Sequence, residues 1–548
     1  MNKVDCFLIG HNEGDFTFYE KSLRFFGMTS ENYRDLRMNF VLYNDRPHTM
    51  PMLINSISGD SGDNQFSVYG DFSLTIASIA SYLHETGLSF DYIIDFQRDK
   101  QKLANVIEDN NAIVYAITTT LYISAQPIIE IVRFIRSMRN DALIIVGGPF
   151  ITGECSTYSQ KHNENVFNMI GADYWINSTQ GEHTLASLIQ CIKNGSNINN
   201  IPNLIFKSEK QFSFTHVEYD GRPLSESPIR WELFRNHIGK HVSIRTARSC
   251  PFSCAYCAFP KHQGAYETLR FNQGVDDLFA ILNDYGVESV NIIDDSFNVP
   301  NVRFKDILRM KIRNNCTFRW NAFIRCQFLD CEAVSLMRES GCDGVFLGIE
   351  SADQGILDNM NKNVSVADYV KGMKLLKDAG IATFASFIFG FPGETDISVQ
   401  KSIAFIRDYC PDFYRIHLWY YDHMTSIHEN AYSYDLNGRH YTWSHATMDS
   451  RTAQDYIEQS FSEIKESIWM PQYNFDYIGI LKMLRSGMSM ENIKKCITSF
   501  NNCIVKNLNI SGENMKNMDS CEYTVFKDSL YAKNEVFGSE ESLSNAYN

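Results

Sequence analysis

The sequence lacks the positive charge of a nucleic-acid-binding protein and the long apolar runs of a membrane protein. Aspartate and glutamate outnumber lysine and arginine, so the formal net charge is −15. Such a chain has no basic field to attract a phosphate backbone. No apolar run approaches the roughly 18 residues of a membrane span, and the apolar residues 4–9 are followed at once by polar ones. We therefore expect a cytoplasmic protein that binds neither nucleic acid nor membrane.

The 14 cysteines have no spacing typical of a disulfide framework, and a chain of 548 residues does not need such cross-links. Hydrophobic residues make up 44% of the chain, which is enough to form folded cores. At about 150 residues per domain, the length predicts three or four structural units.

Three of the cysteines are closely spaced. Cys250, Cys254 and Cys257 lie within eight residues, shortly after the short apolar run 242–247. Cysteine thiolates hold iron–sulfur clusters, and a four-iron cluster bound by three thiolates keeps one iron open. A zinc site completed by His262 is one alternative, because structural zinc takes four ligands. A redox pair of Cys254 and Cys257 is another, although it leaves Cys250 unexplained.

With Tyr256 before the last cysteine, this stretch resembles the C-x3-C-x-(aromatic)-C cluster motif of radical S-adenosylmethionine (SAM) enzymes. The resemblance implies a [4Fe-4S] cluster held by the three cysteines. Its open iron would bind the amino and carboxylate groups of SAM, and an electron from the cluster would split SAM to a 5′-deoxyadenosyl radical.

Before this motif, apolar strands alternate with helical patterns, which is typical of a parallel sheet covered on both faces. The expected strands are residues 4–9, 92–94, 112–117, 143–146 and 172–176, and residues 11–70 look irregular. The pattern predicts a Rossmann-like domain over residues 1–195, with ligands at the strand ends 118–123, 147–150 and 179–182. The chain lacks a G-x-G-x-x-G motif, so nicotinamide and flavin have no support.

Placed ahead of a radical SAM motif, this domain resembles the cobalamin-binding domain of B12-dependent radical SAM enzymes. The similarity lies in residues 145–149 and in the turn Gln180, Gly181 and Glu182. The Asp-x-His-x-x-Gly signature of a histidine-ligated cobalamin is absent, and we expect His11, His48 and His84 to be surface or loop residues. The resemblance implies that Thr120, Leu121 and Tyr122 meet the lower face of cobalamin. Gly147 and Gly148 would allow close approach of its nucleotide tail.

A connector over residues 196–240 leads to renewed alternation over residues 241–425, which predicts a partial barrel of six βα units. Reactive groups belong at the carboxyl ends of such strands. The polar or glycine residues there are Asp294, Asp295, Arg325, Glu350, Ser351 and Gly390. Glu350 suits a contact with the ribose or ammonium of SAM, or a cap on the following helix. The two aspartates suit the same site or a solvated turn, and Gly390 suits turn geometry.

Beyond the barrel, residues 426–506 are rich in aromatics and end in helical patterns, and we expect these aromatics to be core more often than substrate contacts. Residues 507–548 are rich in Asn, Ser and Glu with little periodicity, which predicts a disordered tail.

Longer stretches narrow the resemblance to the phosphinothricin P-methyltransferase family of cobalamin-dependent radical SAM enzymes. The stretches are residues 9–13, 246–252, 293–300, 337–348, 359–362 and 443–449. The resemblance implies that one SAM methylates cob(I)alamin and a second yields the deoxyadenosyl radical. That radical would take a hydrogen from the substrate, which then collects the methyl group of methylcobalamin. The acceptor would be an unactivated carbon or a phosphinate phosphorus of a small molecule or peptide precursor. The electron donor would be a reductant such as flavodoxin or ferredoxin.

Two alternatives remain at this point. One is a radical SAM cyclase or rearrangement enzyme that uses cobalamin without methyl transfer. The other is a non-enzymatic module that binds cobalamin or zinc. A tRNA methylthiotransferase is disfavoured, since Cys155 and Cys191 lack the local spacing of a further cluster motif and the chain is acidic.

Overall fold

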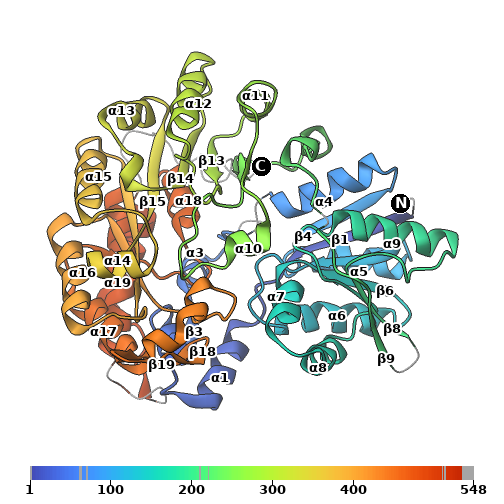
Figure 1. The fold of residues 1–548 in the computed structure, drawn as a ribbon, viewed down its shortest axis with the longest axis horizontal. Coiled ribbons are helices and arrows are strands. Elements are labelled where there is room, and N and C mark those ends of the chain that lie inside the picture. Colours follow the sequence, from blue (N-terminus) through green and yellow to red (C-terminus); the bar gives the residue numbers. More distant parts are fainter. Residues whose placement is uncertain are drawn as a thin grey trace. The chain divides into compact units, whose positions relative to one another are not determined.

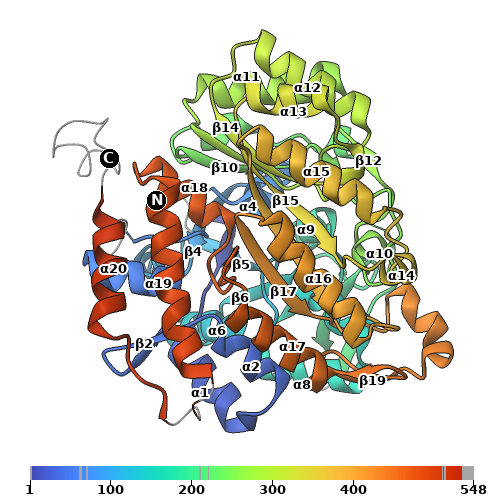
Figure 2. The same ribbon diagram turned by 90° about the vertical axis from the view of Figure 1, so that its left-hand side faces the viewer.

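A computed structural model describes residues 3–60, 65–69, 72–208, 211–219, 221–508, 510 and 514–532. The chain forms two compact units (Figures 1 and 2). Unit 1 comprises residues 1–15 and 69–239, and unit 2 comprises residues 16–68 and 240–548. No helix among the described residues is both long and apolar enough to span a bilayer.

Unit 1 is built on a seven-stranded sheet in the order β4-β1-β5-β6-β7-β8-β9. Its first five strands are parallel, β8 pairs antiparallel with β7, and β9 pairs antiparallel with β8. The strands are β1 Val4–His11, β4 Phe90–Asp95, β5 Ala112–Thr118, β6 Leu143–Gly147, β7 Tyr174–Ile176, β8 Leu204–Ser208 and β9 Gln211–Phe214. The helices are α4 Leu74–Glu85, α5 Lys100–Glu108, α6 Gln126–Met138, α7 Pro149–Thr157, α8 Gln160–Ile170 and α9 Glu182–Asn194, with short 3-10 turns at Leu224–Glu226 and Trp231–Phe234.

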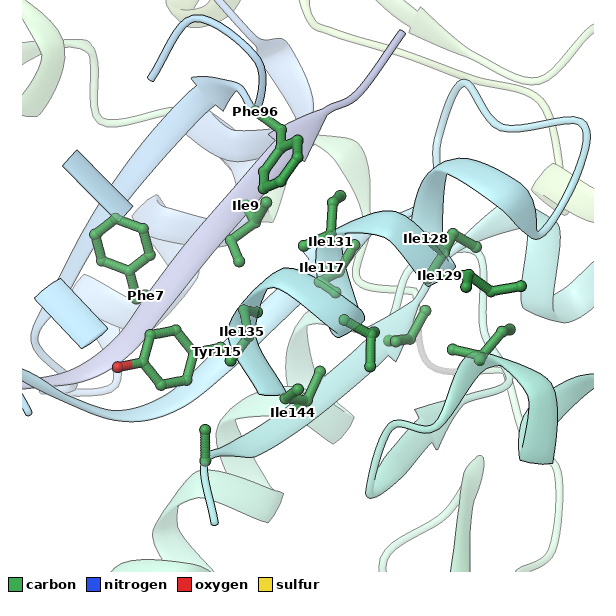
Figure 3. Close-up of a cluster of buried hydrophobic side chains, with 14 of the residues drawn as sticks. Phe7, Ile9, Phe96, Tyr115, Ile117, Ile128, Ile129, Ile131, Ile135 and Ile144 are labelled. Atoms are coloured by element: carbon green, nitrogen blue, oxygen red, sulfur yellow. The ribbon is translucent and has the colours of Figure 1, made fainter. Parts of the chain in front are cut away.

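The central strands of unit 1 are apolar on both faces because helices cover both. Helices α4 and α9 pack together, whereas α5, α6 and α8 pack with one another (Figure 1). Figure 3 shows part of the resulting core, where Ile117 of β5 and Ile128 and Ile131 of α6 lie together. The predicted parallel α/β fold is therefore confirmed for this unit.

Unit 2 contains a second seven-stranded sheet in the order β10-β13-β14-β15-β16-β17-β21, with every pairing parallel. The strands are β10 His241–Ile244, β13 Ser289–Ile292, β14 Arg319–Ile324, β15 Cys342–Glu350, β16 Ala382–Phe389, β17 Phe413–Leu418 and β21 Ile468–Trp469. Helices α11 Asp276–Asp284, α12 Asn301–Arg313, α13 Cys331–Glu339, α15 Val366–Asp378, α16 Asp396–Tyr409 and α17 Ser450–Glu463 cover this sheet (Figure 2). The six predicted barrel strands are present, and β21 adds a seventh.

Smaller elements complete unit 2. They are β11 Ala247–Arg248, α10 Phe259–Gln263, β12 Glu267–Thr268, η4 Phe271–Val275, η5 Cys326–Phe328, α14 Gln354–Asn359, η6 Ser426–Tyr434, β18 Asn437–Arg439, β19 Thr442–His445, β20 Met448–Asp449, α18 Tyr477–Arg485, α19 Met490–Leu508 and α20 Ser520–Tyr531.

Residues 16–68 depart from the prediction of an irregular stretch within the first domain. They form α1 Phe16–Gly27, α2 Glu31–Arg37, β2 Val41–Tyr43, β3 Arg46–His48 and α3 Met50–Ser58, and they belong to unit 2. Arg34 of α2 pairs with Asp455 and Glu458 of α17. These helices are short and gain their stability from packing against distant residues, so the local sequence pattern did not reveal them.

The prediction of disorder from residue 507 onward is wrong for the described part of that segment. Helix α20 packs on α19, where the Ser499 hydroxyl donates to the Glu522 carbonyl at 2.6 Å and Phe526 is fully buried. Few apolar residues of α20 make these contacts, which explains the weak periodicity. Residues 533–548 lie outside the described residues.

Candidate functional site

Most of the residues predicted for the cofactor site in unit 2 follow the carboxyl ends of parallel strands. The cysteine loop comes after β10 and the short strand β11, Asp294 and Asp295 follow β13, Arg325 follows β14, Glu350 ends β15 and Gly390 follows β16. Because these strands are parallel and paired, their carboxyl ends share one edge of the sheet. The topology therefore brings these residues together, as the sequence predicted.

The three cysteines of the loop lie close enough to influence one another electrostatically. Burial, and less strongly the neighbouring Cys254 and Cys250 sulfurs, raises the pKa of the Cys257 thiol to about 11. Burial also raises the pKa of Cys250. In the described part of the chain no three histidine, cysteine or acidic side chains surround a single metal-ion position. Three neighbouring thiols suit a cluster that offers a separate iron to each.

Backbone contacts from distant segments hold the cysteine loop. The Ala255 N–H donates to the Met360 carbonyl at 2.8 Å, and the Ile427 N–H donates to the Ala255 carbonyl at 3.2 Å. The Asn361 amide donates to the Ser253 carbonyl at 2.9 Å. The loop is therefore fixed from both sides.

Glu350 is the centre of a buried polar cluster next to this loop. Its carboxylate forms an ion pair with Lys362 at 2.8 Å and accepts the Tyr256 hydroxyl at 3.1 Å. The Lys362 ammonium also donates to the Tyr256 oxygen at 2.8 Å. Glu350 has a φ of 63°, a left-handed conformation that marks strain in a non-glycine residue. Burial, then the nearby carboxylate, raises the pKa of Tyr256 well above its usual value, so its hydroxyl remains a donor.

The alternative role of Glu350 as a helix cap is wrong. Asp353 is the N-cap of α14, and its side chain accepts the Ile356 N–H. The Ser351 hydroxyl accepts the Asp353 N–H at 3.2 Å and lies 3.5 Å from the Ser402 hydroxyl. Ser351 therefore stabilises the turn after β15, while the Glu350 side chain is available for the site.

Asp294 and Asp295 have different surroundings. Asp294 is buried, and its oxygens accept the Thr246 N–H at 2.6 Å, the Ala247 N–H at 2.9 Å and the Thr246 hydroxyl. These bonds tie the end of β13 to the strand that leads into the cysteine loop. Asp295 opens to the surface, yet surrounding protein atoms, and then the Asp294 charge, raise its pKa to about 7. The alternative of a solvated turn therefore does not apply to Asp294.

Gly390 is required by packing as well as by turn geometry. Its φ is +92°, and a Cβ atom there would lie 2.2 Å from the Trp443 ring. The Gly390 N–H donates to Glu394 at 2.5 Å, and the His445 Nε2 lies 3.2 Å from the Gly390 carbonyl. Trp443 and His445 belong to the 443–449 stretch that contributed to the family resemblance, and the structure gives them a packing role at this turn.

Unit 1 has its own cavity at the carboxyl ends of β5, β6 and β7. Its empty volume is about 580 Å³, including the open mouth. The sequence-predicted residues that line it are Thr120, Gly147, Gly148, Gly181 and Glu182. The α4 residues Thr75, Ile76 and Ile79 also line it and were not predicted. A strand edge with apolar walls, hydroxyl groups and glycines suits a large organic ligand with polar substituents.

The glycines that line this cavity are required for different structural reasons. Gly148 has a φ of +111°, so it supports the left-handed turn after β6. A Cβ atom at Gly147 would lie 3.1 Å from Ile176, and one at Gly181 would lie 2.6 Å from it. These two glycines therefore make room for Ile176 as well as bordering the cavity.

Three predicted cobalamin contacts do not line the cavity. Tyr122 is buried and donates its hydroxyl to the Gly10 carbonyl, whereas Leu121 is 55% exposed. Gln180 also lies outside the cavity lining. His11, predicted as a surface or loop residue, is the last residue of β1; its ring nitrogens are buried and its ring stacks on Tyr122. The loop prediction failed here because an aromatic side chain after a strand can turn back into the core.

Lys362 is the member of the buried Glu350 cluster that sequence reasoning missed. It was noted only as part of the stretch 359–362, and a single lysine after a helix carries no local signal. Its ion pair with Glu350 arises only when the turn after α14 folds against the end of β15.

Residues 244–406 match the profile of the radical SAM superfamily. An uncharacterised methyltransferase of Pyrococcus horikoshii is 25% identical over 288 residues, which cover 50% of this chain and 60% of that protein. The radical SAM methyltransferase TsrM of Kitasatospora setae superposes with a TM-score of 0.51 at 20% identity, over 64% of this chain and 71% of TsrM. The cobalamin-dependent radical SAM enzyme OxsB with aqua-cobalamin bound gives 0.55 at 13% identity, over 84% of this chain and 81% of OxsB.

The aligned region spans about 60% of the length of the Pyrococcus relative. The profile match covers the barrel strands β13 to β16 and all three cysteines, and the OxsB likeness extends over most of the chain. The chain thus carries a radical SAM domain, within the overall fold of the cobalamin-dependent radical SAM enzymes.

Proposed function

We propose that the protein is a cobalamin-dependent radical SAM methyltransferase that acts on a small molecule or a peptide precursor. The observation that carries the proposal is the cysteine loop of unit 2, fixed beside the buried Glu350 cluster at the carboxyl edge of a parallel barrel. The cavity at the sheet edge of unit 1 supports cobalamin as the second cofactor. Similarity to uncharacterised methyltransferases supports methyl transfer, while similarity to anaerobic magnesium-protoporphyrin IX monomethyl ester cyclases keeps the cyclase alternative in the test below.

Each residue of the site has a task in this proposal. Cys250, Cys254 and Cys257 hold the cluster, and Glu350 receives hydrogen bonds from the ribose or ammonium of SAM. Asp294 acts as a positioning residue, because its hydrogen bonds fix the strand before the loop. Lys362 holds Glu350 and Tyr256 in place.

When bound, these groups supply the chemistry: the cluster supplies an electron that splits SAM to a radical, and cobalamin carries the methyl group. The chain positions both and keeps water away from the reacting groups. The acceptor, an unactivated carbon or a phosphinate phosphorus, is part of the proposal, as is reduction by a flavodoxin- or ferredoxin-type donor. Sites rather than folds decide the substrate.

The proposal is tested by anaerobic reconstitution with iron, sulfide and hydroxocobalamin, followed by incubation with SAM and dithionite. Mass spectrometry is expected to detect both 5′-deoxyadenosine and S-adenosylhomocysteine, and cobalamin should remain bound after desalting. Cys254→Ala is expected to abolish deoxyadenosine, whereas Cys331→Ala, at an exposed cysteine outside the loop, should keep it.

Deoxyadenosine without S-adenosylhomocysteine would support the rearrangement alternative instead. Absence of both products, with zinc in the metal analysis, would overturn the enzyme proposal.

A further inference from the structure

Arg325 places a buried positive charge on one of the three cluster cysteines. Its Nη2 donates to the Cys254 sulfur at 3.4 Å and to the Lys362 carbonyl at 3.1 Å. The guanidinium carbon lies 3.6 Å from the centroid of the Phe252 ring, which is a close cation–π contact. Cys254 and Phe252 both belong to the cysteine loop, so Arg325 contacts the loop through both its sulfur and its ring.

Two hydrogen bonds between the Arg325 backbone and the Asn298 side chain fix the position of Arg325. Its N–H donates to the Asn298 side-chain oxygen at 2.9 Å, and the Asn298 amide donates to the Arg325 carbonyl at 2.8 Å. Asn298 is fully buried, and Arg325 is only 9% exposed. The guanidinium is therefore held in one orientation before any ligand binds, and forming its contact with sulfur requires little rearrangement.

This charge lacks the anionic partner that a buried arginine normally has. Among the ion pairs of the described residues, none joins Arg325 to a carboxylate, and its Nη1 is buried without a hydrogen-bond partner. Arg415 provides a contrast in the same barrel: it also stacks on an aromatic ring, that of Trp469 at 4.4 Å, but it pairs with Asp35 at 2.6 Å. A buried charge without a counterion is costly, so the missing anion is expected at the sulfur side of Arg325.

A four-iron cluster bound by three thiolates supplies that anion. The cluster with its thiolates carries a net negative charge, and one-electron reduction makes it more negative by one unit. A fixed cation and hydrogen bonds to the sulfurs stabilise the more negative state, and both act on the reduction potential of a cluster. Arg325 combines these two effects at a single ligand, Cys254.

We propose that Arg325 raises the reduction potential of the cluster by donating to the Cys254 sulfur, so that a low-potential one-electron donor can reduce it. This inference rests on the proposed function, because it requires the cluster. In the step concerned, one electron passes from the donor, which is oxidised, to the cluster, which is reduced. No covalent bond forms or breaks and no proton moves. Arg325 thereby sets which flavodoxin- or ferredoxin-type donors can start the reaction.

The test is an EPR-monitored redox titration of the reconstituted holoenzyme with dithionite. We compare the wild type with Arg325→Lys, which keeps the charge, Arg325→Gln, which keeps a donor, and Arg325→Met, which keeps neither. Arg415→Gln is the matched control, because Arg415 is also buried and stacked on an aromatic ring but does not contact the cysteine loop.

For Arg325→Met, the ratio of reduced to oxidised cluster at a given solution potential is expected to fall at least tenfold, a shift of about 59 mV for one electron. Arg325→Lys and Arg325→Gln should fall between this variant and the wild type, and Arg415→Gln should match the wild type. The dissociation constant of SAM for the oxidised cluster, measured by isothermal titration calorimetry, should change less than tenfold in Arg325→Met.

A wild-type potential in Arg325→Met, with a full iron content, would overturn the inference. A wild-type protein that assembles no four-iron cluster would instead refute the proposed function. Should the variants fail to assemble a cluster, the wild type labelled with ¹⁵N-arginine decides the matter: pulsed EPR of the reduced cluster is expected to detect a weakly coupled arginine nitrogen, and its absence overturns the inference.

Discussion

The buried Glu394 gives the protein a pH-dependent stability that one substitution should remove. Glu394 is fully buried behind the Gly390 turn, where one oxygen accepts the Gly390 N–H and the other has no hydrogen-bond partner. Burial raises its pKa from 4.5 to about 8. The native state therefore holds a proton on Glu394 at neutral pH that the unfolded chain has released.

The sign and size of the effect follow from this shift. Because the folded pKa lies above the unfolded one, the contribution of Glu394 is fully present below about pH 4.5. It is lost as the pH rises towards about 8. At about 1.4 kcal/mol per pKa unit, the loss amounts to at most about 5 kcal/mol over that window. Glutamine has nearly the same shape and donates one hydrogen more than the protonated carboxyl, but it never ionises.

We expect Glu394→Gln to be more stable than the wild type at pH 8, and this advantage should shrink as the pH is lowered to 5. The assay is urea denaturation followed by circular dichroism at several pH values, read as the difference between the two proteins. Taking the difference cancels the other titrating groups. Parallel pH profiles for the two proteins would refute the reasoning.

Three further predictions concern the two sites. Lys362→Met should lower the free energy of unfolding by about 3–5 kcal/mol because it leaves Glu350 buried and unpaired, and adding Glu350→Gln should restore part of that loss in urea denaturation. Gly390→Ala should destabilise the protein by several kcal/mol more than Gly487→Ala does. Both glycines have a φ near +92°, but only Gly390 lacks room for a Cβ atom. Equal melting temperatures of the two variants would contradict this. Thr120→Trp should reduce the cobalamin absorbance retained after desalting, whereas Leu121→Trp, next to it but outside the cavity lining, should not; equal retention would argue against the unit 1 cavity as the cobalamin site.

The sequence predicted the features that are determined by a short stretch of residues, and it missed those that depend on tertiary packing. The cysteine loop is contained in eight residues, and Glu350 could be placed because a parallel strand brings its last residue to the edge of the sheet. Lys362 could not be found, because its contact with Glu350 depends on how the turn after α14 packs. Tyr122 was expected to contact cobalamin, but its side chain is buried in the core of unit 1. Only tertiary packing decides whether an aromatic residue after a strand faces a ligand or the core.

The same limit applies to whole segments. Helices α1 to α3 and α20 are short, and their buried residues are few, so neither propensity nor periodicity marks them. The partners of α2 lie more than 400 residues away, as for Arg34 and Glu458. The parallel strands of both units, in contrast, are rich in apolar residues, and apart from β21 they were predicted within a few residues of their bounds.

The assignment of residues 16–68 to unit 2 bears on how the chain is made and cut. During synthesis, α2 leaves the ribosome more than 400 residues before Asp455 and Glu458. Arg34 can therefore form its ion pairs only after most of the barrel has been synthesised. A fragment that starts at Lys240, where the second segment of unit 2 begins, would contain every barrel strand. It would also lack Asp35, and Arg415 would remain buried without its carboxylate. Biochemical work on the radical SAM domain therefore needs the N-terminal helices, supplied either in the same chain or as a separate peptide.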